Sequence, residues 1–79
     1  MVEREPGVIG RNMRRLRDAR GLSGNALAKA AGLRQSQVWD LESGRRHNPT
    51  VNVLAAIAQA LECGVADLLA DAATRAGGV

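Results

Sequence analysis

The stretch LAKAAGLRQSQVWDLESG, residues Leu27–Gly44, has the spacing of two short helices that cross at a steep angle. Ala28 is small enough for a second helix to approach, and Gly32 can adopt the positive φ of a tight turn between helices. Val38 and Leu41 then form the inward side of the second helix. Its outward side carries Gln35, Ser36, Trp39 and Asp40. Such an exposed, polar helix is typical of an element that is inserted into a groove.

The composition favours one small, all-helical domain. The 79 residues are 46% hydrophobic but include a single aromatic residue, so the core must consist of aliphatic side chains and Met. Ala and Leu dominate, β-branched residues are sparse, and no long segment alternates polar and apolar residues. We therefore expect helices, no strands, and little room for a catalytic cleft.

Hydrophobic periodicity and helix-end residues predict five helices. Glycines follow the first three helices, and the hydroxyl oxygens of Ser23 and Thr50 can cap the second and the fourth. Arg34 stands at the N-cap of the third helix without an oxygen acceptor, which suggests another role for it. The expected helices cover residues 8–20, 24–31, 35–43, a stretch after Thr50 that includes 54–61, and 65–71.

Apolar residues three and four apart mark the inward faces of these helices. In the last helix, Val65, Leu68 and Leu69 are all expected to return to the bundle. The segments 1–7 and 71–79 show no such pattern. We interpret them as an N-terminal arm and a C-terminal tail around a single domain, residues 8–70.

Basic charge is concentrated around the central helix pair. Residues 8–50 contain nine basic and three acidic side chains, a net charge of +6, whereas the rest of the chain has a net charge of −3. Ten of the eleven basic residues are Arg, whose planar guanidinium group suits phosphates and guanine edges. The alternative interpretation is the ordinary solvated basic face of a soluble domain. The position of the charge beside the helix pair favours a polyanionic partner.

The sequence has few residues that could form a disulfide, a metal site or a catalytic site. The lone Cys63 can form no internal disulfide, and its spacing from His47 is not that of a zinc site, so we expect Cys63 to pack in the core. No activated nucleophile or glycine-rich phosphate loop is evident. No stretch has the length of a signal peptide's apolar region or a membrane span. We expect a cytoplasmic protein that is not an enzyme and uses no metal or cofactor.

Five segments together resemble the Cro and lambda-repressor-like helix-turn-helix domains, often called XRE-type, over roughly residues 8–70. The segments are IGRNMRRLRDARGLS (9–23), LAKAAG (27–32), QSQVWDLESG (35–44), NPTVNVLAAIAQAL (48–61) and GVADLL (64–69). The resemblance implies a compact all-α fold of five helices in which the second and third form the helix-turn-helix. It also implies a sequence-specific transcriptional regulator, a repressor, that binds double-stranded DNA with the helix at about 35–43 in the major groove.

The resemblance places base contacts at Arg34 and on the outward side of the 35–43 helix. Gln35 can pair bidentately with adenine, and the Ser36 hydroxyl can pair with several bases. Trp39 shares their face and is expected to contact a thymine methyl, a sugar or a phosphate; the alternative is stacking on an arginine or a partner subunit. Asp40 can accept from cytosine N4, with an orienting ion pair to Arg34 or a loop arginine as the alternative.

Phosphate contacts are expected on both sides of that helix. Ser23 and Asn25 lie with exposed amides at the start of the 24–31 helix, where an anion can bind. The other side would be provided by Ser43, Arg45, Arg46 and His47.

The resemblance also pairs Glu42 with Arg17 in a partly buried ion pair that clamps the 35–43 helix to the first helix. Four positions depart from the family pattern, and two of them are Arg34 at the cap and Trp39 on the outer face of the 35–43 helix. Gly24 stands where members usually have a Gln that touches a phosphate and braces the residue equivalent to Gln35. Glu62 stands where a glycine commonly ends the fourth helix.

A dimer on DNA would require half-sites about 34 Å apart. We expect a homodimer, with the last helix and the loop before it as its surface. The alternative function is an antitoxin-like or other module that binds a partner protein with the same fold. Exposed apolar residues on the last helix would favour that alternative, whereas exposed Gln, Ser and Arg on the 35–43 helix favour DNA.

Overall fold

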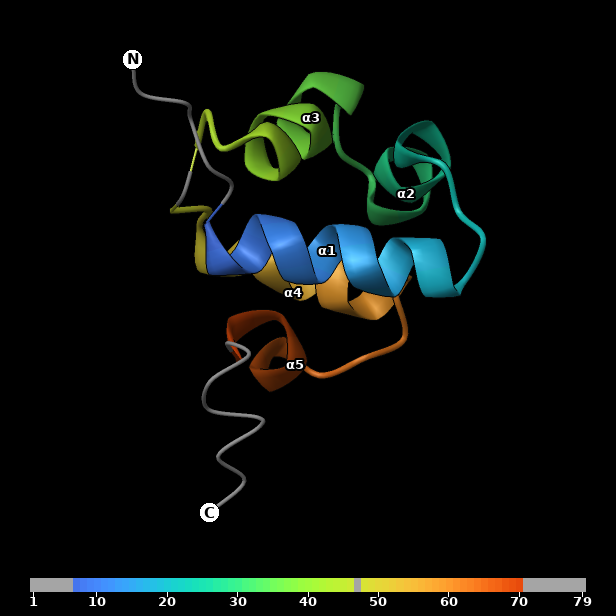
Figure 1. Cartoon of the computed structure of the whole chain (residues 1–79). Coiled ribbons are helices and arrows are strands. Elements are labelled where there is room, and N and C mark those ends of the chain that lie inside the picture. Colours follow the sequence, from blue (N-terminus) through green and yellow to red (C-terminus); the bar gives the residue numbers. More distant parts are fainter. Residues whose placement is uncertain (1–6, 47, 71–79) are drawn as a thin grey trace.

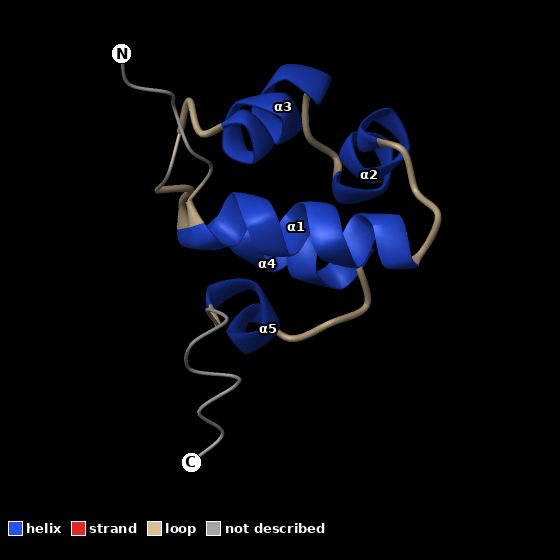
Figure 2. Cartoon of the chain, in the orientation of Figure 1, coloured by secondary structure: helices blue, strands red, loops and turns tan. Residues whose placement is uncertain are grey.

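The structure is a computed structural model that describes residues 7–46 and 48–70 (Figure 1). Within these ranges the chain is helical and contains no strand (Figure 2), so the predicted all-α fold is confirmed. Its helices are α1 (Val8–Ala19), α2 (Gly24–Ala31), α3 (Gln35–Ser43), α4 (Val51–Ala60) and α5 (Val65–Leu69). None of these helices is long and apolar enough to cross a membrane. Predictions for residues 1–6, His47 and residues 71–79 lie outside the described residues.

Helix α1 lies at the centre of the bundle (Figure 1). In this view α2 and α3 lie above α1, α5 lies below it, and α4 lies behind it. Both α3 and α5 pack directly on α1, although they are far apart in the sequence. Helix α1 is therefore the common support of the two helices whose outer faces are discussed below.

The core is aliphatic, as the composition predicted. The side chains of Met13, Leu27, Ile57, Leu61 and Leu68 are fully buried. Ala28, Val38, Leu41 and Ala58 complete this cluster, so every helix contributes to it. Burying one large aliphatic side chain stabilises a fold by about 1.5–3 kcal/mol, which makes this small cluster the main source of cohesion.

The ends of α2, α3 and α4 follow the predicted capping chemistry. The Ser23 hydroxyl oxygen accepts a hydrogen bond from the Ala26 amide at 3.0 Å, and the Thr50 oxygen accepts from the Val53 amide at 3.2 Å. Gly32 and Gly44 end α2 and α3 in the left-handed region, with φ of 70° and 87°. These left-handed turns fix where α3 begins and ends, because other residues rarely adopt such φ values.

Gly10 allows α1 and α3 to touch through their backbones. A β-carbon at this position would collide with the carbonyl group of Leu41, which is backbone and cannot rotate away. Gly10 is buried in the first turn of α1. Within a helix, glycine is unfavourable by about 0.5–1 kcal/mol relative to Ala. The close approach of α3 accounts for the presence of glycine at this position.

The expectation for the last helix was only partly right. Leu68 is fully buried, but Val65 and Leu69 are 37% and 51% exposed. The helix is only five residues long, and Leu69 points about 100° around it from Leu68, so Leu69 is turned away from the core onto which Leu68 packs. Helix α5 thus presents apolar side chains to solvent, in contrast to the prediction.

Candidate nucleic-acid interface

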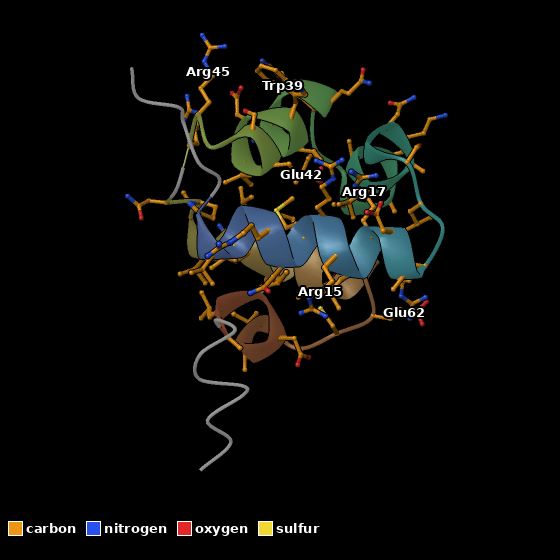
Figure 3. The ribbon with its side chains drawn as sticks, viewed as in Figure 1. Arg15, Arg17, Trp39, Glu42, Arg45 and Glu62 are labelled. Atoms are coloured by element: carbon orange, nitrogen blue, oxygen red, sulfur yellow. The ribbon has the colours of Figure 1, made fainter. Side chains whose placement is uncertain are left out.

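The outward side of α3 is polar and open. Val38 and Leu41 bury the inner side of the helix, which turns Gln35, Ser36 and Trp39 outward. The Trp39 side chain is 58% exposed and lies on the side of α3 away from α1, whereas Glu42 points toward α1 (Figure 3). A large exposed aromatic side chain among polar ones gives this surface both apolar and hydrogen-bonding contacts.

Arg34 precedes α3 and is exposed. Its side chain has no oxygen to cap the helix, and instead the Gln37 side-chain oxygen accepts a hydrogen bond from the Arg34 amide at 2.9 Å. The guanidinium group of Arg34 therefore takes no part in this hydrogen bond. In the described part of the chain, no hydrogen bond holds the side chain of Gln35. Gly24 has no side chain that could support it.

Asp40 is held by the loop that follows α3. Its carboxylate lies 3.8 Å from Nε of Arg46, and its backbone oxygen accepts a hydrogen bond from the Arg46 amide at 3.0 Å. This is the loop ion pair that was one of the two alternatives for Asp40. Because the Arg46 side chain is 76% exposed, the ion pair is weak and can open when a partner approaches.

A hollow of about 580 Å³ runs along one side of α3. It is bounded by Arg34 and Asp40, by Arg46 of the loop, and by Asn48 and Thr50 before α4. The hollow therefore lies between α3 and the first turn of α4, and two arginines, Arg34 and Arg46, are among the residues that line it.

Arg17 and Glu42 connect α3 to α1. Arg17 Nε and Nη2 donate to the two Glu42 carboxylate oxygens at 2.8 and 2.7 Å, and Nη1 donates to the Leu22 carbonyl at 3.0 Å. The two side chains are only 14% and 12% exposed. The hydrogen bonds that Arg17 donates to the Glu42 carboxylate raise the pKa of Arg17, so the guanidinium group remains charged. This bidentate geometry, together with the Gly10 contact, fixes the direction of α3.

A family model described as helix-turn-helix domain matches residues 8–76 of this sequence. The chain belongs to the helix-turn-helix domain family. Its α2 and α3 are the two helices of the motif, and Gly32 lies in the turn between them. The resemblance seen in the sequence is thereby confirmed. A search of curated proteins gave no match.

Solved structures similar to this helix-turn-helix domain are transcriptional regulators. The restriction-modification controller protein C.AhdI from Aeromonas hydrophila is 36% identical over 77% of this chain and 91% of its own, with a TM-score of 0.73. The biofilm regulator SinR of Bacillus subtilis, solved in complex with DNA, is 29% identical over 78% and 98%, with a TM-score of 0.76. The clp gene regulator ClgR from Corynebacterium glutamicum is 30% identical over 87% and 70%, with a TM-score of 0.73.

The predicted phosphate-contacting residues of this helix-turn-helix domain flank α3 on both sides. Ser23 and Asn25 are exposed at the start of α2. Arg45 extends from the loop after α3 to the same side of the molecule as Trp39 (Figure 3). Ser43 is half-buried, and its hydroxyl donates to the Asp40 carbonyl at 3.4 Å, so it is less accessible than the arginines.

Sequence reasoning predicted the Arg17–Glu42 pair but missed two other residues that hold the helices in place, Gly10 and Asn12. Gly10 was visible as an isolated glycine inside a helical pattern, which is a signal of close packing. Asn12 is 7% exposed and bonds two carbonyl oxygens near the end of α5. No periodicity could have indicated that role, because its partners lie 56 and 58 residues away.

Proposed function

We propose that this protein is a sequence-specific, double-stranded-DNA-binding transcriptional regulator, a repressor, whose α3 enters the major groove. The observation that carries the proposal is the open polar face of α3, which the Arg17–Glu42 ion pair holds at a fixed angle. The similarity to SinR, a regulator solved in complex with DNA, supports it. A repressor of this kind would act in the cytoplasm by occupying its operator.

Base reading is assigned to five side chains at and along α3. Gln35 would pair with adenine, Ser36 with several bases, and Arg34 with guanine. Trp39 would contact a thymine methyl, a sugar or a phosphate. Asp40 would accept from cytosine N4 after its ion pair with Arg46 opens.

Phosphate contacts would position the domain on either side of the groove. On one side Ser23, Asn25 and the first amides of α2 would hold one strand. On the other side, Arg45 and Arg46 would hold the other strand, with Ser43 and His47 beside them. These contacts supply affinity that depends on salt but little sequence information.

The proposal includes a homodimer on DNA, with half-sites about one helical turn, or ~34 Å, apart. A second candidate function is favoured by the exposed Val65 and Leu69 on α5. In that function α5 would bind a toxin or another partner protein. The polar face of α3 remains without a role in this alternative, so DNA binding is the stronger proposal.

The test is the selection of binding sites from random DNA, followed by titration at two salt concentrations. We expect one enriched sequence. The Gln35→Ala variant should lose discrimination at one base pair, which costs about 1–3 kcal/mol there. Arg45→Ala should weaken binding to all sequences alike and reduce the salt dependence by about one phosphate contact.

Gln59→Ala, an exposed glutamine on α4, is the matched control and should leave the selected sequence unchanged. Weak binding with no enriched sequence, lost entirely at the higher salt, would leave only a generic basic surface and overturn the proposal.

A further inference from the structure

The outer side of α1 carries a cluster of arginines that the fold does not use. Arg11, Arg14 and Arg15 are exposed, and spacings of three and four residues place Arg14 and Arg15 beside Arg11 on one side of the helix. Among the described residues, none of the three forms an ion pair. Arg15 alone donates a side-chain hydrogen bond, to Asn12 Oδ1 at 3.4 Å. We call these three residues the arginine face of α1.

The arginine face does not serve the stability of the helix. Positive charges three and four residues apart repel each other. The N-terminus of a helix favours negative charge, yet the first turn of α1 contains no acidic residue, and Arg11 lies only three residues after Val8. Arg17, in contrast, has an internal partner in Glu42. A binding partner therefore explains the arginine face better than the fold does.

A hollow lies beside the arginine face. It has a volume of about 500 Å³ and is lined by the three arginines together with Gly10, Asp18 and Glu42. The Glu42 carboxylate already accepts two hydrogen bonds from Arg17. The Asp18 carboxylate is exposed and only loosely paired with Arg17, at 3.7 Å. Along α1 the surface thus presents three cationic groups followed by one anionic group, with space for the side chains of a partner.

We propose that the arginine face of α1 binds an acidic helix of a partner protein. Side chains three and four residues apart on such a helix have Cβ atoms about 5–6 Å apart, which is the spacing of the arginines on α1. Each guanidinium group can donate two hydrogen bonds to one carboxylate, in the geometry that Arg17 and Glu42 have within the chain. A basic residue one turn further along the partner would pair with Asp18 and set the register.

The position of the arginine face argues against DNA as its partner. Trp39 and Arg45 lie above α1 in Figure 3, whereas Arg15 lies below it. A duplex on the outer face of α3 would therefore not reach Arg15. The Asp18 carboxylate would repel a row of phosphates, whereas a protein helix can present a basic residue to it. The proposal goes beyond the DNA-binding function and does not depend on it, since a partner on α1 leaves the outer face of α3 free.

The test uses the full chain and a synthetic, alanine-rich peptide of about 20 residues, long enough to form a helix. The patterned peptide carries three Glu at i, i+3 and i+4 and one Lys at i+7, and it is made in this order and in the reverse order, because a partner helix can run in either direction. A scrambled peptide of the same composition places its Glu residues on different sides.

The titration is followed by NMR in about 0.1 M salt, where charges more than ~10 Å apart are largely screened. The patterned peptide should shift the amide signals of Arg11–Asp18 and, in at least one of its two orders, bind at least about threefold more tightly than the scrambled peptide. Equal binding of patterned and scrambled peptides, or no shift of the α1 signals, would overturn the proposal.

Charge reversal separates the arginine face from the overall charge of the chain. Arg14→Glu should weaken the binding of the patterned peptide at least about fivefold, because it replaces attraction by repulsion. Lys29→Glu makes the same change of charge at an exposed residue of α2 and should leave the dissociation constant within about twofold. Equal weakening by the two substitutions would refute the proposal.

This proposal and the DNA-binding function can fail separately. Peptide binding by a chain that selects no DNA sequence would refute the proposed function and leave the acidic partner standing. The patterned peptide should still bind when the chain is saturated with the selected duplex. If Arg15→Glu instead lowered the salt dependence of duplex binding by about one phosphate contact, the arginine face would be a DNA contact and the proposal would be wrong.

Discussion

Helices α3 and α5 are both short, both rest on α1, and are held there by different means. A bidentate ion pair and a backbone contact at Gly10 fix α3. One buried leucine, the Asn12 amide and the Arg20 contact hold α5. The outer face of α3 is polar with one tryptophan, whereas that of α5 is apolar. Helix α1, itself without a predicted base contact, therefore determines how both outer faces are presented.

The largest effect is expected where the two backbones of α1 and α3 meet. In Gly10→Ala the new methyl group would collide with the Leu41 carbonyl, so α3 must move away from α1. We expect the free energy of unfolding to fall by about 3 kcal/mol, at the upper end of overpacking effects, as measured by urea denaturation.

Gly24→Ala is the matched control for that substitution. Its methyl group would lie in ordinary contact, 3.9 Å from the Val38 side chain, so the free energy of unfolding should stay the same or rise by up to about 1 kcal/mol. Equal stability of the two variants would show that the α1–α3 contact is not as close as described.

The next largest effect is expected at the ion pair. Glu42→Ala leaves the Arg17 guanidinium group nearly buried without its partner. We expect a loss of about 2 kcal/mol in the free energy of unfolding, several times the value of an exposed pair, and a lower thermal midpoint.

Asp18→Ala removes the other carboxylate near Arg17, which is 3.7 Å away and 63% exposed, and should change stability by less than about 0.5 kcal/mol. An unchanged thermal midpoint in Glu42→Ala would mean that the ion pair does not hold α3.

A smaller effect, of opposite sign, is expected at the turn before α5. Glu62 has a φ of +56°, which costs a residue other than glycine roughly 1 kcal/mol. Glu62→Gly relieves this strain and gives up only an exposed ion pair with Arg20 at 3.1 Å. We expect the free energy of unfolding to rise by about 0.5–1 kcal/mol.

Glu62→Ala separates the two effects, because it loses the ion pair but keeps the strain. It should be no more stable than the wild type in the same thermal melts. Stabilisation by both variants to the same extent would show that the ion pair, and not the backbone, is unfavourable.

The smallest effect is expected at Cys63, beside the same turn. Partial burial raises the pKa of the Cys63 thiol, and the nearby Asp67 carboxylate raises this pKa further, against a smaller opposite effect of Arg20. Since the thiolate is the reactive form, iodoacetamide should alkylate the folded chain more slowly than the urea-unfolded chain near pH 8.

Folding favours the protonated thiol, so the small stabilisation from this group should be present below the pKa of the unfolded chain. It should be lost as the pH rises through the higher pKa of the folded state. Faster alkylation of the folded chain would contradict this assignment.

The two regions also differ in how well the sequence predicted them. The ends of α2 and α3 follow from local chemistry: Ser23 caps α2, and glycines close both helices. The outward position of Trp39 follows from the helical period alone. The Arg17–Glu42 pair followed from the family resemblance and is present in the structure.

The orientation of α5 could not be predicted in the same way. Its five residues contain too little periodicity to distinguish Leu68 from its apolar neighbours. What selects Leu68 is a set of contacts from distant residues, above all the Asn12 amide. The Gly10 contact is also tertiary, and only the presence of a glycine within a helical pattern indicated it.

The central claim, that the outer face of α3 binds DNA, is tested most directly by the fluorescence of Trp39. This is the single tryptophan of the chain, and it is exposed on that face. Titration with the selected duplex should change its intensity or emission wavelength, saturate together with the anisotropy of the labelled duplex, and be absent with a scrambled duplex at higher salt. Saturated binding by anisotropy with unchanged Trp39 emission would contradict the account.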